Sequence, residues 1–337
     1  MSFKSKNMKK KFFIINTFNI SNGVKNFREE LIRKLDKDKW DIHYLEFNTL
    51  GFKLYDINKK EYKLRDHDAN IFINPAPSWL LNKNSLIIIH DLISLEFSNI
   101  NYALFYFKPI IKYFIYFLSW KTYKHNLNFL CISRSTQNRF REIIKKYLKF
   151  KKYNLNFGYQ SIRYLDKNIN KTLTESIENK KIYSWMAFYD KQPHKNPKII
   201  KGIRDYSQFS NINFALICKN RNIERIRHRN DRKYMNKNFL NPNDQILKEI
   251  YKNTYYLVYP SLVEGFGLPI IEALSFRVIP LIYPSKINLE IYGNDYRFYF
   301  NDIEKLQNFI KKKPSKNDLI YLSNIRNKVI EKIEKNS

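Results

Sequence analysis

The segment EGFGLPIIEAL, which begins at Glu264, combines residue types that could bind a phosphorylated sugar. Gly265 and Gly267 lack a Cβ atom, so a ligand can approach their backbone closely. Pro269 has the fixed dihedral that suits a helix start, where unpaired N–H groups attract phosphate. Carboxylates such as Glu264 and Glu272, the latter expected in the first helical turn, accept hydrogen bonds from sugar hydroxyls. A tight turn whose glutamates favour the helix start is the competing interpretation.

Short apolar runs alternate with amphipathic helical patterns along the whole chain. Continuous apolar strands separated by helices are typical of parallel sheets covered on both faces. Two such sets predict an α/β protein with two doubly wound domains. The predicted strands are 11–16, 70–75, 85–91, 128–133, 153–158, 181–188, 213–219, 255–261 and 278–284. The predicted helices are 25–35, 134–148, 243–253 with Asn243 as N-cap, and 317–335.

A polar stretch at 165–181 has no apolar periodicity and is the best candidate for an interdomain linker. We therefore predict an N-terminal Rossmann-like domain over 1–165 and a C-terminal Rossmann-like domain over 166–315. A final helix over 316–337 can pack back on the first domain.

The 337-residue chain carries a formal net charge of +30. Such a charge suggests nucleic acid, a membrane surface or anionic substrates as partners. A codon bias toward Lys, Asn, Ile, Phe and Tyr is an equally good explanation for much of it. With 44% hydrophobic residues the chain can form packed cores, which excludes a disordered polymer.

Cys131 and Cys218 lie inside apolar runs and are predicted to be buried thiols in a reducing compartment. The apolar run FFII near the start is too short for a signal sequence and is predicted to be a first buried strand. No charge-free stretch of 18 apolar residues occurs, so no spanning helix is expected. These features favour a cytoplasmic protein.

The sequence YPSLVEGFGLPIIEAL, residues 259–274, resembles the signature of retaining glycosyltransferases of family 4 (group 1). That signature has two glutamates separated by seven residues around a Gly-Phe-Gly-Leu-Pro core. Other segments agree with the family in order and spacing, strongly in the second half of the chain and thinly in the first. The resemblance implies the GT-B fold, in which two Rossmann-like domains face each other across a cleft.

By this resemblance the second domain binds a nucleotide-diphosphate sugar as donor. Glu264 is implied to contact the donor sugar during catalysis, and Glu272 to bind the ribose. The backbone of Phe266, Gly267 and Leu268 is implied to face the sugar and the diphosphate.

The family also has an arginine and a lysine that hold the diphosphate. Lys195 matches the lysine in the segment YDKQPHKNPKIIKGI. The position of the arginine falls near 188–190, which holds no basic residue. A leaving diphosphate needs cations to stabilise its charge, so Lys191 is the candidate to replace the arginine.

His90 and Asp91 end a predicted parallel strand, and the carboxyl end of such a strand faces a ligand crevice. A lone histidine can equally be a hydrogen-bonded core residue. In the family a histidine at this point lies by the donor sugar, so the resemblance implies a catalytic His90. Asp91, and Gly23 in the first loop, are implied on the acceptor side.

The triplet from Asp66 to Asp68 matches a D-x-D motif, which binds a divalent metal in another glycosyltransferase fold. Here it precedes a strand instead of following one, so we expect a solvated turn. The six histidines form no H-x-x-x-H pair. We therefore expect no metal and no cofactor beyond the donor substrate.

The aromatic and basic segment 101–125 has two interpretations. An interfacial helix would place its rings at lipid headgroups beside snorkelling lysines, here Lys108, Lys112 and Lys121. The other interpretation is a core helix of the first domain. In either case Pro109 is expected to interrupt the helix.

The cation-rich segment 219–237 can meet phosphates or be a solvated loop. Because stacking aromatic residues are almost absent from it, we expect no nucleic-acid partner.

The resemblance thus predicts sugar transfer to a glycan or lipid-linked acceptor, as in the biosynthesis of bacterial surface polysaccharide (O-antigen or capsule). The enzyme would work in the cytoplasm, with a peripheral position on the inner face of the plasma membrane as an option. The alternative is a noncatalytic, basic protein of the same fold that binds nucleic acid or anionic membrane.

Overall fold

The computed structural model divides the chain into two compact units, one of residues 1–161 with 336–337, the other of residues 162–335. The structure describes residues 10–17, 22–37, 39–48, 53–56, 58–66, 68–96, 103–150, 152–160, 183–207, 214–218, 237–240 and 242–337. The predicted linker 165–181 and nearly all of the cationic segment 219–237 lie outside these residues.

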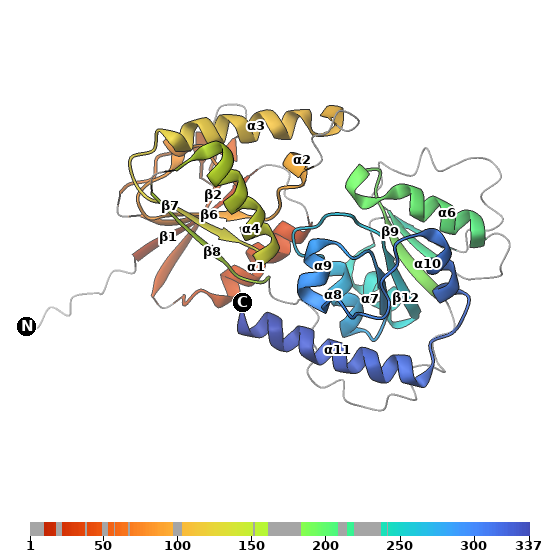
Figure 1. Cartoon of the computed structure of the whole chain (residues 1–337). Coiled ribbons are helices and arrows are strands. Elements are labelled where there is room, and N and C mark those ends of the chain that lie inside the picture. Colours follow the sequence, from red (N-terminus) through yellow and green to blue (C-terminus); the bar gives the residue numbers. More distant parts are fainter. Residues whose placement is uncertain are drawn as a thin grey trace, which may run out of the picture. The chain divides into compact units, whose positions relative to one another are not determined.

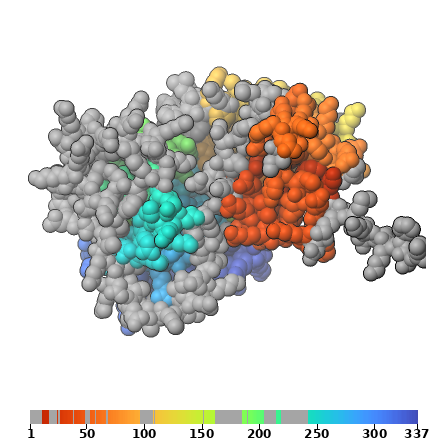
Figure 2. Space-filling view, turned by 180° about the vertical axis from the view of Figure 1, so that it is seen from behind, coloured from red at the N-terminus to blue at the C-terminus, as the bar shows by residue number. Residues whose placement is uncertain are grey.

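Unit 1 is built on a sheet with the strand order β4-β3-β2-β1-β5-β6-β7-β8. Six neighbouring strands of this order, β2, β1, β5, β6, β7 and β8, pair in parallel. Strands β3 and β4 extend the edge beside β2 and pair antiparallel. In the view from behind, the orange-red surface belongs to the part of this unit from β1 to β4 (Figure 2). The strands are β1 Lys10–Thr17, β2 Trp40–Asn48, β3 Lys53–Tyr55, β4 Glu61–Tyr62, β5 Ala69–Phe72, β6 Ser85–Ile89, β7 Leu127–Cys131 and β8 Tyr153–Phe157.

Helices α3 and α4 cover one face of this sheet (Figure 1). Alternate strand residues such as Ile87, Ile89 and Phe129 are buried there against Trp120 of α3 and Phe140 of α4. Burial of these large side chains removes apolar surface from water, which is the main favourable term in folding. The helical elements of unit 1 are α1 Asn22–Lys34, η1 Ser78–Leu80, α2 Ile93–Glu96, α3 Ala103–Lys121, α4 Arg134–Ile143 and the π-helical turn η2 Ile144–Leu148.

Helix α3 is continuous, so the prediction that Pro109 interrupts it was wrong. Proline removes one backbone hydrogen bond to the residue four positions earlier, and here that loss falls close to the helix start, where the following turns are unaffected. One face of α3 is core, as Tyr116 and Trp120 show. The opposite face exposes four large apolar side chains that are 43–61% accessible: Phe107, Ile111, Phe114 and Leu118.

Unit 2 has an all-parallel sheet with the order β11-β10-β9-β12-β13. This is the doubly wound order, and the strand order reverses between β9 and β12. The strands are β9 Tyr183–Tyr189, β10 Phe214–Cys218, β11 Lys237–Leu240, β12 Thr254–Tyr259 and β13 Ile279–Ile282. The helices are η3 Pro193–Lys195, α6 Pro197–Ser207, α7 Asp244–Lys252, α8 Leu268–Ser275, α9 Lys286–Tyr292, α10 Ile303–Ile310 and α11 Lys316–Lys335.

The apolar runs predicted as strands all form strands, and the predicted helices form with boundaries shifted by a few residues. Asn243 caps α7, because its side chain accepts a hydrogen bond from the Ile246 N–H at 2.9 Å. Strands β2, β3, β4 and β11 were missed, since they are short or have charged and polar residues that interrupt their apolar pattern. Cys131 and Cys218 are buried free thiols, as predicted.

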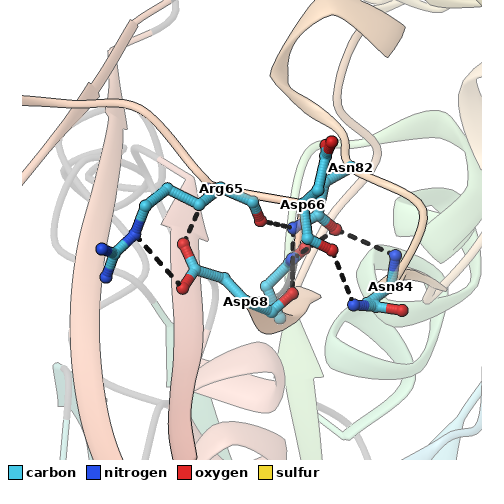
Figure 3. Close-up of polar contacts among 6 residues, drawn as sticks. Arg65, Asp66, Asp68, Asn82 and Asn84 are labelled. Carbon is cyan, nitrogen blue, oxygen red and sulfur yellow. Dashed lines mark hydrogen bonds and ion pairs between the residues drawn. The ribbon is translucent and has the colours of Figure 1, made fainter.

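The expectation of a solvated turn at the D-x-D motif was wrong for Asp68, which is 1% exposed. Its Oδ2 accepts a hydrogen bond from the Arg65 N–H at 2.7 Å, and its backbone carbonyl accepts one from Asn82 at 2.9 Å (Figure 3). A carboxylate can be buried when backbone donors replace its water. Asp68 therefore organises the turn that enters β5.

Candidate functional site

The predicted donor-site residues of unit 2 follow the two central strands, β9 and β12. Because these strands are parallel and adjacent, their carboxyl ends meet at the same edge of the sheet. Lys195 lies in η3 after β9, and Glu264 lies in the loop after β12. The strand order reverses between these two strands, which is where ligands bind in sheets of this kind.

Lys195 and Glu264, 69 residues apart in sequence, form an ion pair between Nζ and Oε1. The hydroxyl of Tyr259 donates a hydrogen bond to the same Oε1 at 2.9 Å and accepts one from Lys195 Nζ at 3.3 Å. Glu264 is only 8% exposed, and Lys195 is partly buried. These three side chains make a closed polar cluster beside the glycine loop.

Burial and pairing act in opposite directions on the ionisation of this cluster. Burial alone would raise the pKa of the Glu264 carboxyl, but the Lys195 ammonium outweighs it and holds that pKa below its usual value. Burial would likewise lower the pKa of Lys195, whereas the Glu264 carboxylate raises it. Both groups are therefore charged at neutral pH.

The loop between Glu264 and α8 has the geometry expected of the glycine motif. Gly267 has φ +81° and ψ 45°, a left-handed conformation at the N-cap of α8. Phe266 is buried, Leu268 is the first residue of the helix, and Pro269 is the second. No side chain caps this helix start. Pro269 has no N–H, and the Ile270 N–H donates to the Gly267 carbonyl at 3.0 Å, which leaves the Leu268 N–H for a ligand.

Glu272 lies in the second turn of α8, so its predicted place in the first turn was wrong. The helix starts at Leu268, and Glu272 is its fifth residue. The carboxylate is 7% exposed, and its Oε2 accepts a hydrogen bond from the hydroxyl of the buried Tyr251 at 3.3 Å. Tyr251 in turn stacks on Phe276, with ring centroids 5.2 Å apart. Glu272 is thus held in place from α7.

Lys191 lies two residues after the end of β9 and is partly exposed. It has no hydrogen bond or ion pair with any residue that the structure describes. Its neighbour Asp190 accepts a hydrogen bond from the Gln192 N–H at 3.1 Å and so shapes the turn. Lys191 is close in sequence to the position where an arginine was expected, but nothing in the structure assigns it to a phosphate.

The predicted residues of the first domain belong to unit 1. His90 follows β6, is 8% exposed and meets the Phe27 ring edge-on at 5.1 Å. It hydrogen-bonds to the backbone of Ile73, while Nε2 is buried without a partner among the described residues. Burial lowers the pKa of His90 to about 4, so its imidazole is neutral at pH 7.

Asp91 has a local structural role that the sequence did not indicate, and Gly23 lies inside a helix. The Asp91 carboxylate accepts a hydrogen bond from the Ile93 N–H at 3.2 Å and caps the short helix α2. Gly23 is the second residue of α1, one position inside the helix instead of in the loop before it.

Three residues in or beside the site in unit 2 were missed from the sequence: Tyr251, Tyr259 and the buried His194, whose backbone carbonyl accepts a hydrogen bond from the Leu262 N–H at 2.8 Å. A tyrosine at the end of a buried strand, directly before Pro260, was the available signal for Tyr259. Tyr251 and His194 gave no signal, because a buried tyrosine or histidine is ordinarily a core residue. Among the described residues, no group of three or more His, Cys, Asp and Glu side chains gathers at one point.

Comparison with solved structures defines the class of fold. WaaG, a glycosyltransferase of lipopolysaccharide biosynthesis, is 12% identical with a TM-score of 0.61, and 95% of each chain is covered. The trehalose 6-phosphate synthase of Burkholderia multivorans is 8% identical with a TM-score of 0.60, covering 98% of this chain and 96% of that one. These similarities confirm the predicted GT-B fold with two Rossmann-like domains.

TarM of S. aureus, solved with UDP, is 15% identical with a TM-score of 0.55 over 87% of this chain. The chain spans 61% of that TarM chain. No curated protein matches the sequence significantly.

Residues 170–332 match the family described as Glycosyl transferases group 1. This segment contains Lys195, Glu264 and Glu272. The resemblance drawn from the sequence is therefore confirmed for the second half of the chain, which matches this family's model.

We expect Gly267→Ala to destabilise unit 2 by about 1–2 kcal/mol, because a side chain disfavours the left-handed conformation. The added Cβ would also lie 3.2 Å from Cδ1 of Ile270. Urea unfolding measures the change. Gly158→Ala is the control, because its Cβ would meet only ordinary contacts and its φ is not positive. Equal stability of the two variants would contradict the strain at Gly267.

We expect stability to depend on the ionisation of His194. Burial, aided by the Lys195 ammonium, lowers the pKa of His194 from 6.5 to about 4. The unfolded chain then binds the proton more readily than the folded one, so the free energy of unfolding falls as pH drops from 6.5 to 4. His194→Gln should remove up to about 3 kcal/mol of this pH dependence.

Urea unfolding at a series of pH values gives the slope for each variant. His125→Gln, at an exposed position, is the matched control. Parallel curves for the wild type and His194→Gln would show that His194 does not carry the effect.

Proposed function

We propose that the chain is a retaining glycosyltransferase that uses a nucleotide-diphosphate sugar as donor. The observation that carries the proposal is the Lys195–Glu264–Tyr259 cluster at the point where the strand order of unit 2 reverses. A cation, a carboxylate and an uncapped helix start lie together there. The cation and the helix start suit the diphosphate of such a donor, and the carboxylate suits its sugar hydroxyls.

The ion pair gives Lys195 two alternative partners in this proposal. Without donor, Lys195 neutralises Glu264 inside the protein. With donor, the diphosphate offers Lys195 a stronger negative charge, and Glu264 becomes free to accept hydrogen bonds from the sugar. Lys191, the Phe266–Leu268 backbone and Glu272 complete the donor site, with Glu272 on the ribose.

The proposed reaction keeps the anomeric configuration. The acceptor hydroxyl attacks the anomeric carbon on the face that the diphosphate leaves. The new carbon–oxygen bond forms as the bond to the diphosphate breaks, and a phosphate oxygen takes the proton. No side chain is needed as general base and no metal is assigned; the neutral His90 is proposed to act at the sugar, with Asp91 and Gly23 on the acceptor side.

The acceptor is proposed to be a glycan or lipid-linked glycan of bacterial surface polysaccharide. The neighbour WaaG, named for lipopolysaccharide biosynthesis, supports this class of acceptor. We place the enzyme in the cytoplasm, at the inner face of the plasma membrane.

The outer face of α3 supports a membrane position. Phe107, Ile111, Phe114 and Leu118 recur at spacings of three and four residues, which puts them on one stripe of the helix. The helix contains three lysines and no acidic residue, which suits anionic lipid. Lys112 does not contribute as expected, because it points to the core side, over the rings of Phe47 and Tyr116. No helix among the described residues is long and apolar enough to span a bilayer.

A screen of UDP-, GDP- and dTDP-sugars for thermal stabilisation tests the donor site, because a ligand of the folded state raises the melting temperature. No stabilisation by any of them, together with salt-dependent binding to anionic polymer or vesicles, would favour the noncatalytic alternative.

We expect Glu272→Gln to weaken donor binding by about tenfold or more, because a charged hydrogen-bond acceptor is lost. Glu264→Gln should lower the rate of sugar transfer by about a hundredfold or more. Calorimetry with the stabilising nucleotide sugar and a transfer assay measure the two effects.

Glu331→Gln, at an exposed position on α11, is the matched control for both substitutions. Melting temperatures identify any loss that comes from unfolding. An unchanged transfer rate and an unchanged donor affinity in both variants would contradict the assignment of Glu264 and Glu272 to the donor site.

We expect the double variant Phe107→Ser, Phe114→Ser to reduce cosedimentation with phosphatidylglycerol vesicles by about tenfold, because membrane affinity scales with buried apolar area. Ile320→Ser on α11 removes a similarly exposed apolar side chain and is the control. Equal binding of the wild type, the double variant and Ile320→Ser would exclude this role for α3. Equal binding of the wild type to phosphatidylcholine and phosphatidylglycerol vesicles would exclude a preference for anionic lipid.

A further inference from the structure

An open groove lies in unit 1 at the amino ends of strands β5 to β8, with a volume of about 720 Å³. Residues that begin these strands line it, among them Ser85, Asn128 and Tyr153. His90 follows the carboxyl end of β6, so the groove is at the opposite edge of the sheet from the predicted acceptor residues. Its volume is within the rough range of 300–1,000 Å³ of small-molecule sites.

Side-chain amides dominate the polar lining of the groove. Asn154 and Asn156 are exposed on the same face of β8, because residues two apart in a strand share a face. Asn128 lies opposite Asn154 in the β7–β8 register and accepts a hydrogen bond from Asn154 Nδ2 at 2.8 Å. Asn154 Oδ1 and the amide of Asn156 have no partner among the described residues, so both can bind a ligand.

The wall of the groove at Asn84 is fixed by the D-x-D segment (Figure 3). Asn84 Nδ2 donates to the carbonyl of Asp66 at 2.9 Å, and the Asn84 N–H donates to Asn82 Oδ1 at 3.0 Å. The buried Asn82 is held by hydrogen bonds to the backbone of Asp68 and to Ser85. A wall held in this way does not have to be ordered when a ligand binds, which favours affinity.

The charge of the groove differs from that of the chain. The chain has a net charge of +30, yet Lys83 is the single charged residue among those that line the groove. Such a lining does not favour nucleic acid or anionic lipid over other ligands. Amides offer both donors and acceptors, as sugar hydroxyls do. The lining of the groove therefore suits a neutral, polyhydroxylated chain.

We propose that this groove binds a neutral oligosaccharide, away from the donor site. Asn154, Asn156 and Asn84 hydrogen-bond its hydroxyls. The choice of a glycan over another neutral polyol rests on the proposed function, in which the groove holds a part of the glycan acceptor remote from the reaction.

The test measures binding of neutral hexasaccharides (α-glucan, chitin and mannan) to the full chain by calorimetry. We expect saturable binding of at least one, and an affinity about five- to tenfold lower for Asn154→Ala, Asn156→Ala, because two hydrogen-bonding amides are removed. Asn324→Ala, at an exposed position on α11, is the matched control and should bind as the wild type does.

Failure of this proposal can be told apart from failure of the proposed function. Nucleotide-sugar stabilisation should be unchanged in Asn154→Ala, Asn156→Ala, and oligosaccharide binding should be unchanged in Glu272→Gln. No saturable binding of any of the three hexasaccharides would overturn the groove assignment. The same holds if binding is unaffected by the double variant or is weakened equally by Asn324→Ala.

Discussion

The buried ion pair between Lys195 and Glu264 is the interaction on which the candidate site depends. Removing either charge from water is costly, and neither could be buried at this sheet edge without the other. Tyr259 satisfies a further hydrogen bond of both partners. The pair therefore ties the loop after β9 to the loop after β12. In the proposed donor complex, the diphosphate replaces Glu264 as the partner of Lys195, and the sugar hydroxyls replace Lys195 as the partner of Glu264.

The sheet topology makes this pairing possible. In a doubly wound order, the loops after the two central strands leave toward opposite faces, which opens a crevice between them. Lys195 and Glu264 come from these two loops, and Gly267 allows the second loop to turn directly into α8. Glu272 then projects from α8 and is held by Tyr251 from α7. The candidate site thus draws on three separate stretches of the sequence: η3, α7 and the segment from β12 to α8.

Unit 1 shows how polar groups can be built into a parallel sheet at its two ends. At the carboxyl end of β6, a neutral His90 is enclosed by Phe27 and the Ile73 backbone. At the amino ends, Asp68 and Asn82 form a buried network that fixes the turn before β6. The outer stripe of α3 is a different kind of surface, with apolar side chains that this unit leaves uncovered. These three features are the basis for the three contacts that we propose for unit 1, with sugar, glycan chain and lipid.

The sequence by itself determined the alternation of strands and helices, the cap at Asn243 and the glycine motif around Gly267. These features depend on local propensities and on backbone dihedrals, which neighbouring residues set. Only the tertiary structure decided which side chains meet across 69 residues, as Lys195 and Glu264 do. It also decided that Asp68 is buried and that α3 has both a core face and an exposed face. Burial and pairing depend on what packs against a residue, and one strand or helix does not contain that information.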